Sequence, residues 1–393
     1  MDKRLNILWL ASWYPNRTDA FVGDFIERHA KAVSTCVKLT VMLVVKDELI
    51  SDGKVEVDRS TAGNITVYRV YYGRGGVGGI VEKFNSSMRY FRLQKETYLQ
   101  MVAEHGAFDL VHVHVAMKAG MLALWIKQQF NVPYVVTEHW TGYYPGAPEN
   151  IYTRNFIFRY LTRKVLEKTS LLLPVSADLG KVICSHLVKV PFEVVPNVVD
   201  TSVFKLGDRV PTPFRFLHVS SLGYQKNPQG ILKACKILKD GGHEFELVMI
   251  GSEVPELRAL ANSLHLEQLV RFEGIVTYEE VARHMQLASA FILFSRFENL
   301  PCVILEALCS GLPVVSSRVG GIAEVINQDN GLLVPSEDIH SLADAMKQII
   351  VDYHRYNRLA ISETAAAQFN FQLVAHQHLD IYHRVLQDKS HAG

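Results

Sequence analysis

The sequence predicts an α/β protein made of two domains, each with a doubly wound parallel sheet. Short, wholly apolar runs such as KLTVMLVV alternate with amphipathic segments of helical period, and this alternation starts again after a turn-rich stretch near residue 200. Wholly apolar strands are typical of parallel sheets, because helices cover both faces of the sheet. With 393 residues, 48% of them hydrophobic, the chain is long enough to build two cores.

In the first half, strands are expected at LNILWLA, KLTVMLVV, ITVYRVYY, DLVHVHV, PYVVTEH, LLLPVS and FEVVPN, since each is a short apolar run rich in β-formers. Helices are expected at GDFIERHAKAV, near 80–104 and near 116–129. We therefore expect residues 1–198 to form an N-terminal domain. Residues 199–212 are rich in turn formers and lack a period, which indicates a linker.

The alternation resumes with six strand candidates, FRFLHVSS, FELVMIG, LVRFEG, AFILFS, PVVSS and GLLVP, separated by helical segments. Residues 213–368 are expected to form a second domain. The last segment, 369–393, contains FNFQLVAHQHLDIYHRVL and predicts a helix that returns to the first domain.

Composition and charge restrict the class of protein. Basic residues number 41 and acidic residues 40, and the net charge of +1 provides no global reason to expect a nucleic-acid partner. The five cysteines are scattered without a C-x-x-C pair, which favours a reducing cytoplasm over a zinc or disulfide framework. The first apolar run is short and interrupted by Asn6, so it predicts a strand and not a signal peptide. No stretch approaches the roughly 18 apolar residues of a membrane span.

Two carboxylates and two glycine-containing turns mark the stretch FENLPCVILEALCSGLPVVSSRVGG. In open parallel sheets, ligands collect at the carboxyl ends of the strands, so Glu298, after the strand AFILFS, is expected at the mouth of a cleft between the domains. Glu306 follows eight residues later, about 80° past two helical turns, so the two carboxylates need not share a face. Gly320 and Gly321 lie between a strand and an expected helix, where a backbone can approach a phosphate closely.

With these motifs the chain resembles the retaining, nucleotide-sugar glycosyltransferases of family 4 (glycosyl transferases group 1), whose GT-B fold places two Rossmann-like domains across a cleft. The resemblance covers nearly the whole chain, and its specific part is the carboxylate pair followed by A-x-x-x-G-x-P-V-V and G-G-x-x-E. These motifs stand at Glu298, Glu306, Gly311, Pro313, Gly320, Gly321 and Glu324. Weaker matches are SSLGYQKNP, VMIGS, RFEGIV and WYPNRTDAFVGDF.

The resemblance implies catalytic roles for Glu298 near the donor sugar, for Lys226 at the leaving phosphates and for His139 beside the transferred sugar. Glu306 would accept hydrogen bonds from the ribose hydroxyls. The remaining donor-binding residues that it implies are Gly23, Gly251, Gly274, Ile275, Val276, Asn299, Leu300, Gly320 and Gly321, with residues 274–276 at the nucleobase. The donor would be a UDP- or GDP-sugar, and neither a cofactor nor a metal is expected.

Several residues keep a second interpretation. Glu306 could be a solvent-exposed position of its helix, and Glu298 and Lys226 could be solvated loop residues. His112 and His114 share one face of a strand and, with His139, suggest a metal site. Packed or hydrogen-bonded histidines are favoured, because neither the geometry of the third ligand nor a carboxylate partner is specified.

The chain departs from the family pattern at two places. Ser221 and Leu222 stand where the family has an Arg-Leu pair, and a serine cannot clamp a phosphate, so Lys226, Arg296 or Arg318 would have to compensate. Glu298 is followed by Asn-Leu-Pro where many relatives have Gly-Phe-Gly, which leaves the choice of donor open.

Two N-terminal segments carry further patterns. GRGGVGG at 73–79 contains G-x-G-x-x-G, but it follows the third strand, so a flexible loop bordering the acceptor is favoured over a dinucleotide site. The helix expected at 80–95 interleaves cations with aromatic residues. This pattern fits either a solvated amphipathic helix or a contact with an anionic membrane or a lipid-linked acceptor.

The sequence therefore predicts a cytoplasmic transferase, and peripheral contact at the inner face of the membrane is the less favoured of the two interpretations of the helix at 80–95. It would move a sugar from a nucleotide sugar to a saccharide or lipid-linked oligosaccharide, in capsule, lipopolysaccharide or exopolysaccharide assembly. One alternative is a sugar-nucleotide 2-epimerase of the same architecture, which would lack the arrangement from Glu298 to Gly321. The other is a non-catalytic sugar-nucleotide-binding protein, which the serine at 221 makes conceivable.

Overall fold

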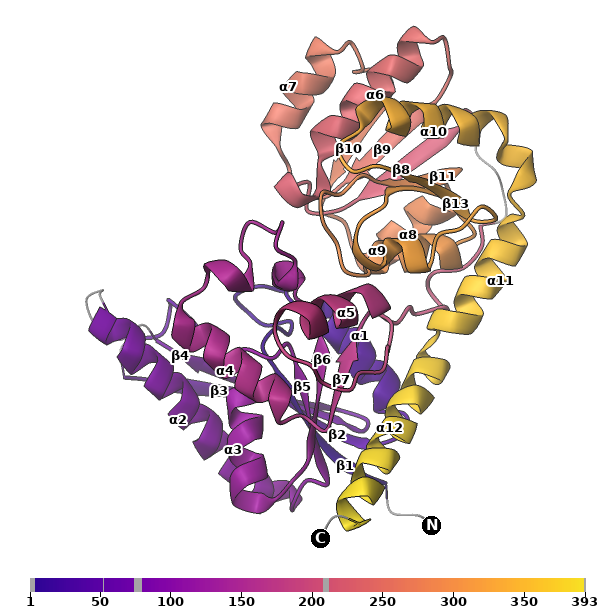
Figure 1. Ribbon diagram of the computed structural model, residues 1–393. Helices are drawn as coiled ribbons and strands as arrows, with labels where there is room; N and C mark the ends of the chain where they lie inside the picture. Colours follow the sequence, from indigo (N-terminus) through magenta and orange to yellow (C-terminus); the bar gives the residue numbers. More distant parts are fainter. Residues whose placement is uncertain (1–3, 52, 74–79, 208–211, 392–393) are drawn as a thin grey trace. The chain divides into compact units, whose positions relative to one another are not determined.

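The computed structural model describes residues 4–51, 53–73, 80–207 and 212–391 (Figure 1). Internal contacts divide the chain into two units, Met1–Pro196 together with Phe371–Gly393, and Asn197–Asn370, which we call the N-terminal and C-terminal domains. Residues 197–207 thus pack within the C-terminal domain, where the Phe204 side chain is 1% exposed and its ring contacts that of Tyr278. The G-x-G-x-x-G stretch lies almost wholly outside the described residues.

The N-terminal domain contains a seven-stranded sheet in the order β3-β4-β2-β1-β5-β6-β7. Its strands are β1 (Asn6–Ala11), β2 (Lys38–Lys46), β3 (Val55–Ala62), β4 (Ile65–Tyr72), β5 (Leu110–His114), β6 (Tyr134–Glu138) and β7 (Leu171–Pro174). Every pairing is parallel except that of β3 with β4. The central strand β1 is buried along its whole length, as its apolar sequence predicts.

Helices pack around this sheet. They are α1 (Asp24–Val33), α2 (Ile80–His105), α3 (Gly120–Phe130), α4 (Phe156–Glu167), α5 (Ala177–His186) and α12 (Phe371–His391), with short 3₁₀ helices η1 (Thr141–Tyr143) and η2 (Ile151–Thr153). The last helix, α12, packs against α1, so the final segment of the chain lies in the N-terminal domain (Figure 1).

The C-terminal domain has a six-stranded sheet, wholly parallel, in the order β10-β9-β8-β11-β12-β13. The strands are β8 (Arg215–Val219), β9 (Glu246–Ile250), β10 (Val270–Gly274), β11 (Ala290–Leu293), β12 (Val314–Ser317) and β13 (Gly331–Val334). The helices are η3 (Tyr224–Lys226), α6 (Pro228–Asp240), α7 (Pro255–Ser263), α8 (Tyr278–Gln286), α9 (Cys302–Cys309), η4 (Gly320–Glu324), α10 (Ile339–Val351), η5 (Tyr353–Arg355) and α11 (Arg358–Phe369).

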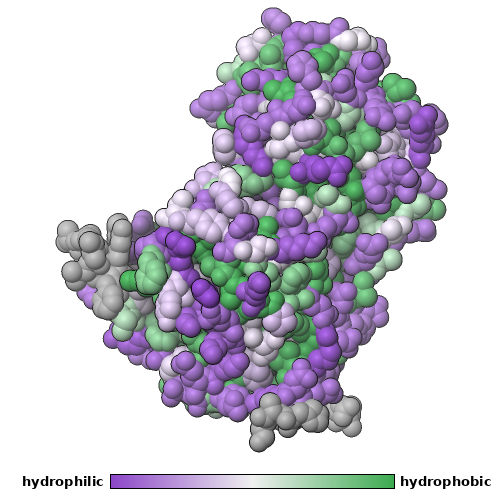
Figure 2. Space-filling view, viewed as in Figure 1, coloured by the Kyte–Doolittle hydropathy of each residue, from purple (hydrophilic) through white to green (hydrophobic). Residues whose placement is uncertain are grey.

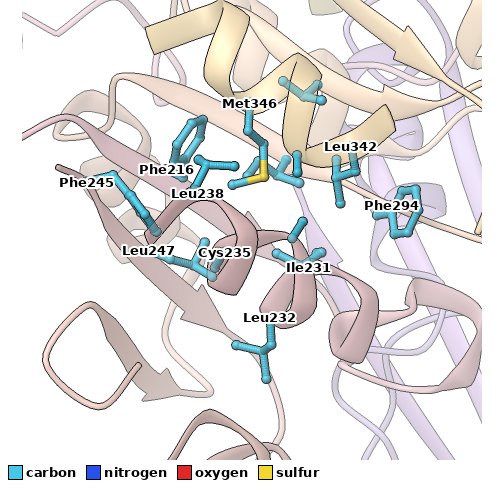
Figure 3. Packing of buried hydrophobic residues seen from close by; sticks show 14 of the residues in the cluster. Phe216, Ile231, Leu232, Cys235, Leu238, Phe245, Leu247, Phe294, Leu342 and Met346 are labelled. Atoms are coloured by element: carbon cyan, nitrogen blue, oxygen red, sulfur yellow. The ribbon is translucent and has the colours of Figure 1, made fainter. Parts of the chain in front are cut away.

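The core of the C-terminal domain lies between its sheet and the helices α6 and α10 (Figure 3). Cys235 and Leu238 of α6 and Met346 of α10 pack over Phe216 and Leu247 of the sheet. The start of α6 is locally encoded: the Asn227 side chain accepts a hydrogen bond from the Gly230 amide, and a proline follows at the first helical position. This cap holds the chain immediately after Lys226 in a defined position.

Three elements differ from the sequence-based expectation. The strand β3 was not expected, because all eight of its residues are exposed and it pairs with β4 only at the edge of the sheet. FEVVPN runs beside β7 without forming a regular strand: Phe192 bridges Leu172, and the amides of Glu193 and Val195 donate to the carbonyls of Leu172 and Pro174. The segment after Gly320 is a five-residue 3₁₀ helix and not the expected α-helix.

Candidate functional site

An ion pair joins two of the predicted site residues in the C-terminal domain. Lys226 ends η3, after β8, and Glu298 lies in the loop after β11. The Nζ atom of Lys226 lies 2.5 Å from Oε1 of Glu298, and the two side chains are 18% and 5% exposed. The alternative that both are solvated loop residues is therefore wrong. The carboxyl ends of neighbouring strands β8 and β11 bring together residues that are 72 positions apart in sequence.

Polar neighbours orient the Glu298 carboxylate. The Ser295 hydroxyl donates a 2.8 Å hydrogen bond to its Oε1 atom, and the Gln225 amide donates a longer one, 3.3 Å, to Oε2. The same Gln225 amide donates to the carbonyl of Phe297 at 2.9 Å. Because a lysine carries three donors and Glu298 uses one of them, the ammonium group can still bind oxygen atoms of a ligand.

Gly320 brings a second turn against this loop. Its φ angle is 52°, and a Cβ atom at this position would lie 1.9 Å from the backbone oxygen of Glu298. The next amide, of Gly321, donates a 2.8 Å hydrogen bond to the carbonyl of Asn299. The expected helix start with amides free for a phosphate is therefore corrected: the helix is a short 3₁₀ turn, and the Gly321 amide is used within the protein.

Two further glycines meet at the ends of β9 and β10. The amide of Gly251 donates to the carbonyl of Gly274 at 2.9 Å, and a Cβ on Gly251 would lie 1.9 Å from the carbonyl oxygen of Ser220. Gly274 has a φ of 74° and no atom within 4 Å of its Cβ position. The neighbouring Ile275 side chain is 62% exposed and Val276 is partly buried, so this segment presents both backbone and an apolar side chain to the surface.

The residues that follow Glu298 are buried. Asn299 and Leu300 are 5% and 4% exposed, and the Asn197 side chain donates a 2.6 Å hydrogen bond to the Leu300 carbonyl. Glu306, on α9, is 3% exposed, so the alternative that it occupies a solvent-exposed position of the helix is wrong. The pKa of the neighbouring Cys309 thiol is raised to about 12, mainly because the thiol is buried and secondly because of the charge of Glu306.

Two arginines were considered as substitutes for the one absent at Ser221, which is itself exposed. Arg296 is already engaged: its Nε atom donates to Glu337 at 2.8 Å, and its guanidinium group lies 4.2 Å from the centre of the Tyr224 ring. Arg318 is exposed at the end of β12. Lys226 thus contacts Glu298 directly, whereas Arg296 packs on Tyr224 at the start of the turn that contains Lys226.

In the N-terminal domain, a buried carboxylate organises the loop that carries His139. Glu138 ends β6 and is fully buried. Its Oε1 atom accepts hydrogen bonds from the amides of His139 and Trp140 at 2.9 and 3.0 Å, and its Oε2 atom accepts from the amide of Ala116 and the hydroxyl of Tyr143 at 3.0 and 2.8 Å. Burial raises the pKa of Glu138, and these four donors oppose that rise.

His139 belongs to a cluster of five imidazoles. Its ring lies 5.9 Å from that of His114 and 6.0 Å from that of His29, while His112 stacks on His114 at 4.3 Å. The ring of His378, on α12, lies 5.6 Å from that of His29. Burial lowers the pKa of His139 to about 3, with a further contribution from His378. Burial also lowers the pKa values of His112, His114 and His378, so these rings and that of His139 are uncharged at neutral pH.

The proposed metal interpretation of these histidines gains no support from the geometry. His112 is held by two hydroxyls, with Nδ1 2.7 Å from the Tyr382 oxygen and Nε2 2.6 Å from the Thr137 oxygen. The ring of His114 packs against those of Trp9 and His112, with ring centres 4.0 and 4.3 Å away. Within the described ranges, no group of three His, Cys, Asp or Glu residues could hold a metal ion.

Gly23 precedes α1 with a φ of 69°. A Cβ atom there would lie 2.6 Å from the backbone carbon of Trp13, so the loop needs glycine for internal packing as well as for any ligand.

Comparisons with known proteins agree on one class of enzyme. The model of glycosyl transferases group 1 matches residues 204–365, and the model of glycosyltransferase family 4 matches residues 60–203. N-acetyl-alpha-D-glucosaminyl L-malate synthase of Bacillus anthracis is 27% identical over 73% of this chain and 77% of its own length. The amylovoran biosynthesis glycosyltransferase AmsK of Erwinia amylovora is 36% identical over 35% of this chain and 36% of its own. This chain is a GT-B glycosyltransferase.

Solved structures show the same fold for this glycosyltransferase. Sucrose-phosphate synthase of Thermosynechococcus elongatus superposes with a TM-score of 0.80 at 20% identity, covering 98% of this chain and 100% of that one. HepE of Anabaena, crystallised with UDP and glucose, superposes with a TM-score of 0.69 at 17% identity, covering 96% and 99%. The models and relatives named here are glycosyltransferases, which counts against the 2-epimerase alternative.

Some neighbours of the candidate residues in the two domains were missed by reasoning from the sequence. Ser295 and Gln225 bind Glu298, and Glu138 holds the His139 loop. For Glu138 a signal was present, since a carboxylate at the end of an apolar strand must find donors when it is buried. In the part of the chain that the structure describes, no helix is both long enough and apolar enough to cross a membrane.

Proposed function

We propose that this glycosyltransferase transfers a sugar, with retention at the anomeric carbon, from a nucleotide-sugar donor to a saccharide or lipid-linked acceptor. The C-terminal domain binds the donor, a UDP- or GDP-sugar, and the N-terminal domain binds the acceptor. Assembly of a capsule, lipopolysaccharide or exopolysaccharide is the setting that we propose, and the name of the Erwinia relative supports it.

The observation that carries the proposal is the Lys226–Glu298 ion pair at the carboxyl ends of β8 and β11. When a nucleoside diphosphate leaves, negative charge develops on its phosphate oxygens, and a cation held in advance stabilises that charge. Glu298 fixes the ammonium group at one side, and two donors of Lys226 remain for the phosphates. No metal is needed for this step.

We assign the other donor contacts by position. The buried carboxylate of Glu306 accepts hydrogen bonds from the ribose hydroxyls, and the segment Gly274, Ile275 and Val276 holds the nucleobase through its backbone. Asn299 and Leu300 follow Glu298 in the same loop, and Gly320 keeps the backbone of that loop in contact with the next turn.

His139 is proposed to contact the transferred sugar. Its low pKa, about 3, keeps the imidazole neutral, so that it offers a hydrogen bond without a charge at neutral pH. Glu138 holds the backbone of the loop through the amides of His139 and Trp140, which limits how far the ring can move.

A thermal-shift screen of nucleotide sugars against the purified protein tests donor binding, since a ligand that binds only the folded form raises its melting temperature. The donor that shifts the melting temperature is then incubated with an acceptor panel, and the product's anomeric configuration is read by NMR. Inversion at the anomeric carbon would contradict the retaining mechanism. Binding without release of nucleoside diphosphate on any acceptor would favour the non-catalytic alternative.

Variants assign the roles. Lys226→Ala removes the charged donor and is expected to weaken donor binding about tenfold to a hundredfold. Glu306→Gln replaces a pure acceptor with an amide and is expected to cost about tenfold. Lys347→Ala, at an exposed position of α10 in the same domain, is the matched control. If all three variants bind and transfer alike, the site assignment is overturned.

A further inference from the structure

The first turns of α4 present an unusual set of exposed apolar side chains. Phe156 is 78% exposed, Ile157 66% and Tyr160 48%. At about 100° per residue, these three side chains fall within one arc of about 100° on the helix. Its buried residues, Thr162, Val165 and Leu166, lie on the opposite side. Single exposed apolar residues are ordinary, whereas three on one face form a patch that usually meets a partner.

Cations outnumber anions in the sequence around this patch. The stretch 149–168 contains Arg154, Arg159, Arg163, Lys164 and Lys168 against only Glu149 and Glu167, a net charge of +3. Glu149 pairs with Arg154 at 2.8 Å, and Glu167 pairs with both Arg163 and Lys164 at 2.7 and 3.0 Å. An excess of positive charge therefore remains beside the exposed rings. In Figure 2, hydrophobic residues show between hydrophilic ones on the face of the N-terminal domain over which α4 runs in Figure 1.

We propose that the exposed face of α4, formed by Phe156, Ile157 and Tyr160 with Arg159 and Arg163, docks the protein on an anionic membrane surface. Aromatic and aliphatic side chains insert at the level of the headgroups, and the flanking cations bind lipid phosphates. The charge favours this occupant: a net positive rim around an apolar patch complements a surface that is both anionic and apolar beneath.

The helix α2 was the segment that the sequence suggested for such a contact, and its described side chains are less available. Arg89 donates to the carbonyls of Gly73 and Lys54 at 3.2 and 2.9 Å. The ammonium group of Lys95 lies 4.6 Å from the ring centres of both Phe91 and Trp125. These two cations serve the packing of the domain itself, and the exposed Arg92 pairs with Glu96 at 3.7 Å, so we favour α4 as the membrane surface.

The place of α4 also connects the surface to the proposed chemistry. The ring of Phe158, which follows Ile157 of the patch, lies 6.1 Å from that of Trp140, whose amide donates to Glu138. A membrane bound at α4 therefore lies next to the loop whose His139 we propose to contact the transferred sugar. This connection rests on the proposed function and identifies the acceptor as lipid-linked, whereas the membrane contact itself does not depend on it.

Sedimentation with lipid vesicles tests the surface. The full chain is expected to bind vesicles of phosphatidylethanolamine with phosphatidylglycerol, to bind phosphatidylcholine vesicles weakly, and to lose binding as salt rises. Phe156→Ser with Ile157→Ser is expected to lower the partition coefficient about tenfold or more. Arg159→Gln with Arg163→Gln is expected to lower it only for the anionic vesicles.

Two controls use the same chemistry elsewhere. Val351→Ser with Leu359→Ser removes side chains that are 61% and 53% exposed in the C-terminal domain, and should leave vesicle binding unchanged. Met88→Ser removes one that is 55% exposed on α2. Because the α4 residues are exposed, their variants should fold, which tryptophan fluorescence verifies.

Three results would overturn the proposal: no binding to anionic vesicles, equal binding by the α4 variants and the parent, or loss of binding only in Met88→Ser. A change of oligomeric state in the α4 variants, without a change in vesicle binding, would assign the face to a protein contact instead. If the chain binds vesicles through α4 but transfers sugar only to water-soluble saccharides, the surface stands and the lipid-linked acceptor fails.

Discussion

Mild acid is expected to destabilise the N-terminal domain through its buried histidines. Burial holds the pKa values of His112 and His114 well below the ordinary value of 6.5, and that of His378 at about 4. The folded domain therefore keeps these rings neutral, while the unfolded chain takes up protons below about pH 6.5. The free energy of unfolding is highest above that pH and falls as pH drops toward the folded-state pKa.

The magnitude follows from one side chain. For His378, with a folded-state pKa of about 4 against 6.5 in the unfolded chain, going from pH 7 to pH 5 lowers the free energy of unfolding by about 2 kcal/mol. His112 and His114 act in the same direction, so this figure is a lower bound. Most carboxylates titrate below pH 5, which keeps their contribution out of this interval.

Tryptophan fluorescence reports on this domain alone, because all four tryptophans, Trp9, Trp13, Trp125 and Trp140, belong to it. Urea titrations at pH 7, 6 and 5 would yield its free energy of unfolding at each pH. The variant His378→Leu should lose about 2 kcal/mol less than the parent between pH 7 and 5.

The control for this experiment is His383→Leu, an exposed histidine on the same helix, and it should behave as the parent. An unfolding free energy that stays constant from pH 7 to pH 5 would refute the reasoning. So would an identical acid loss in the parent and in His378→Leu.

Three further predictions concern the two loops. Gly320→Ala should destabilise the C-terminal domain by about 2–3 kcal/mol in calorimetry, because the new Cβ atom would collide with the Glu298 carbonyl. Gly242→Ala is the control: its φ is also positive but the space around it is open, so it should cost only about 1 kcal/mol. Equal costs for the two variants would argue against the collision. Glu138→Gln should lower the free energy of unfolding of the N-terminal domain by about 2–3 kcal/mol in urea titrations, since an amide side chain cannot accept from all four donors. An unchanged midpoint of urea unfolding would contradict this. Lys226→Ala should lower the free energy of unfolding by about 2–3 kcal/mol, because it leaves the Glu298 carboxylate buried without its cation. Adding Glu298→Gln should recover part of that loss. Strict additivity of the two substitutions would show that the pair is not coupled.

The strands and helices that patterning predicted are largely those with apolar faces. β1 and β2 are predicted by continuous apolar runs, and these runs are buried in the structure. β3 could not be predicted in this way, because its pairing depends on backbone hydrogen bonds to β4 while its side chains remain in water. Likewise, the 3₁₀ helix that begins at Gly320 could not be predicted from its own residues, because it depends on contacts with the loop at Glu298 and Asn299.

The sequence by itself predicted that this protein is an α/β chain with two largely parallel sheets, and it singled out Glu298 and Glu306 through a motif of the glycosyltransferase family that the chain resembles. Only the tertiary structure decided that Lys226 pairs with Glu298 and that Glu138 anchors the His139 loop. The physical reason is that periodicity encodes which face of an element is buried. An ion pair or a buried hydrogen bond depends instead on which strands are neighbours in the sheet, because that order decides which loops meet at the ends of the strands.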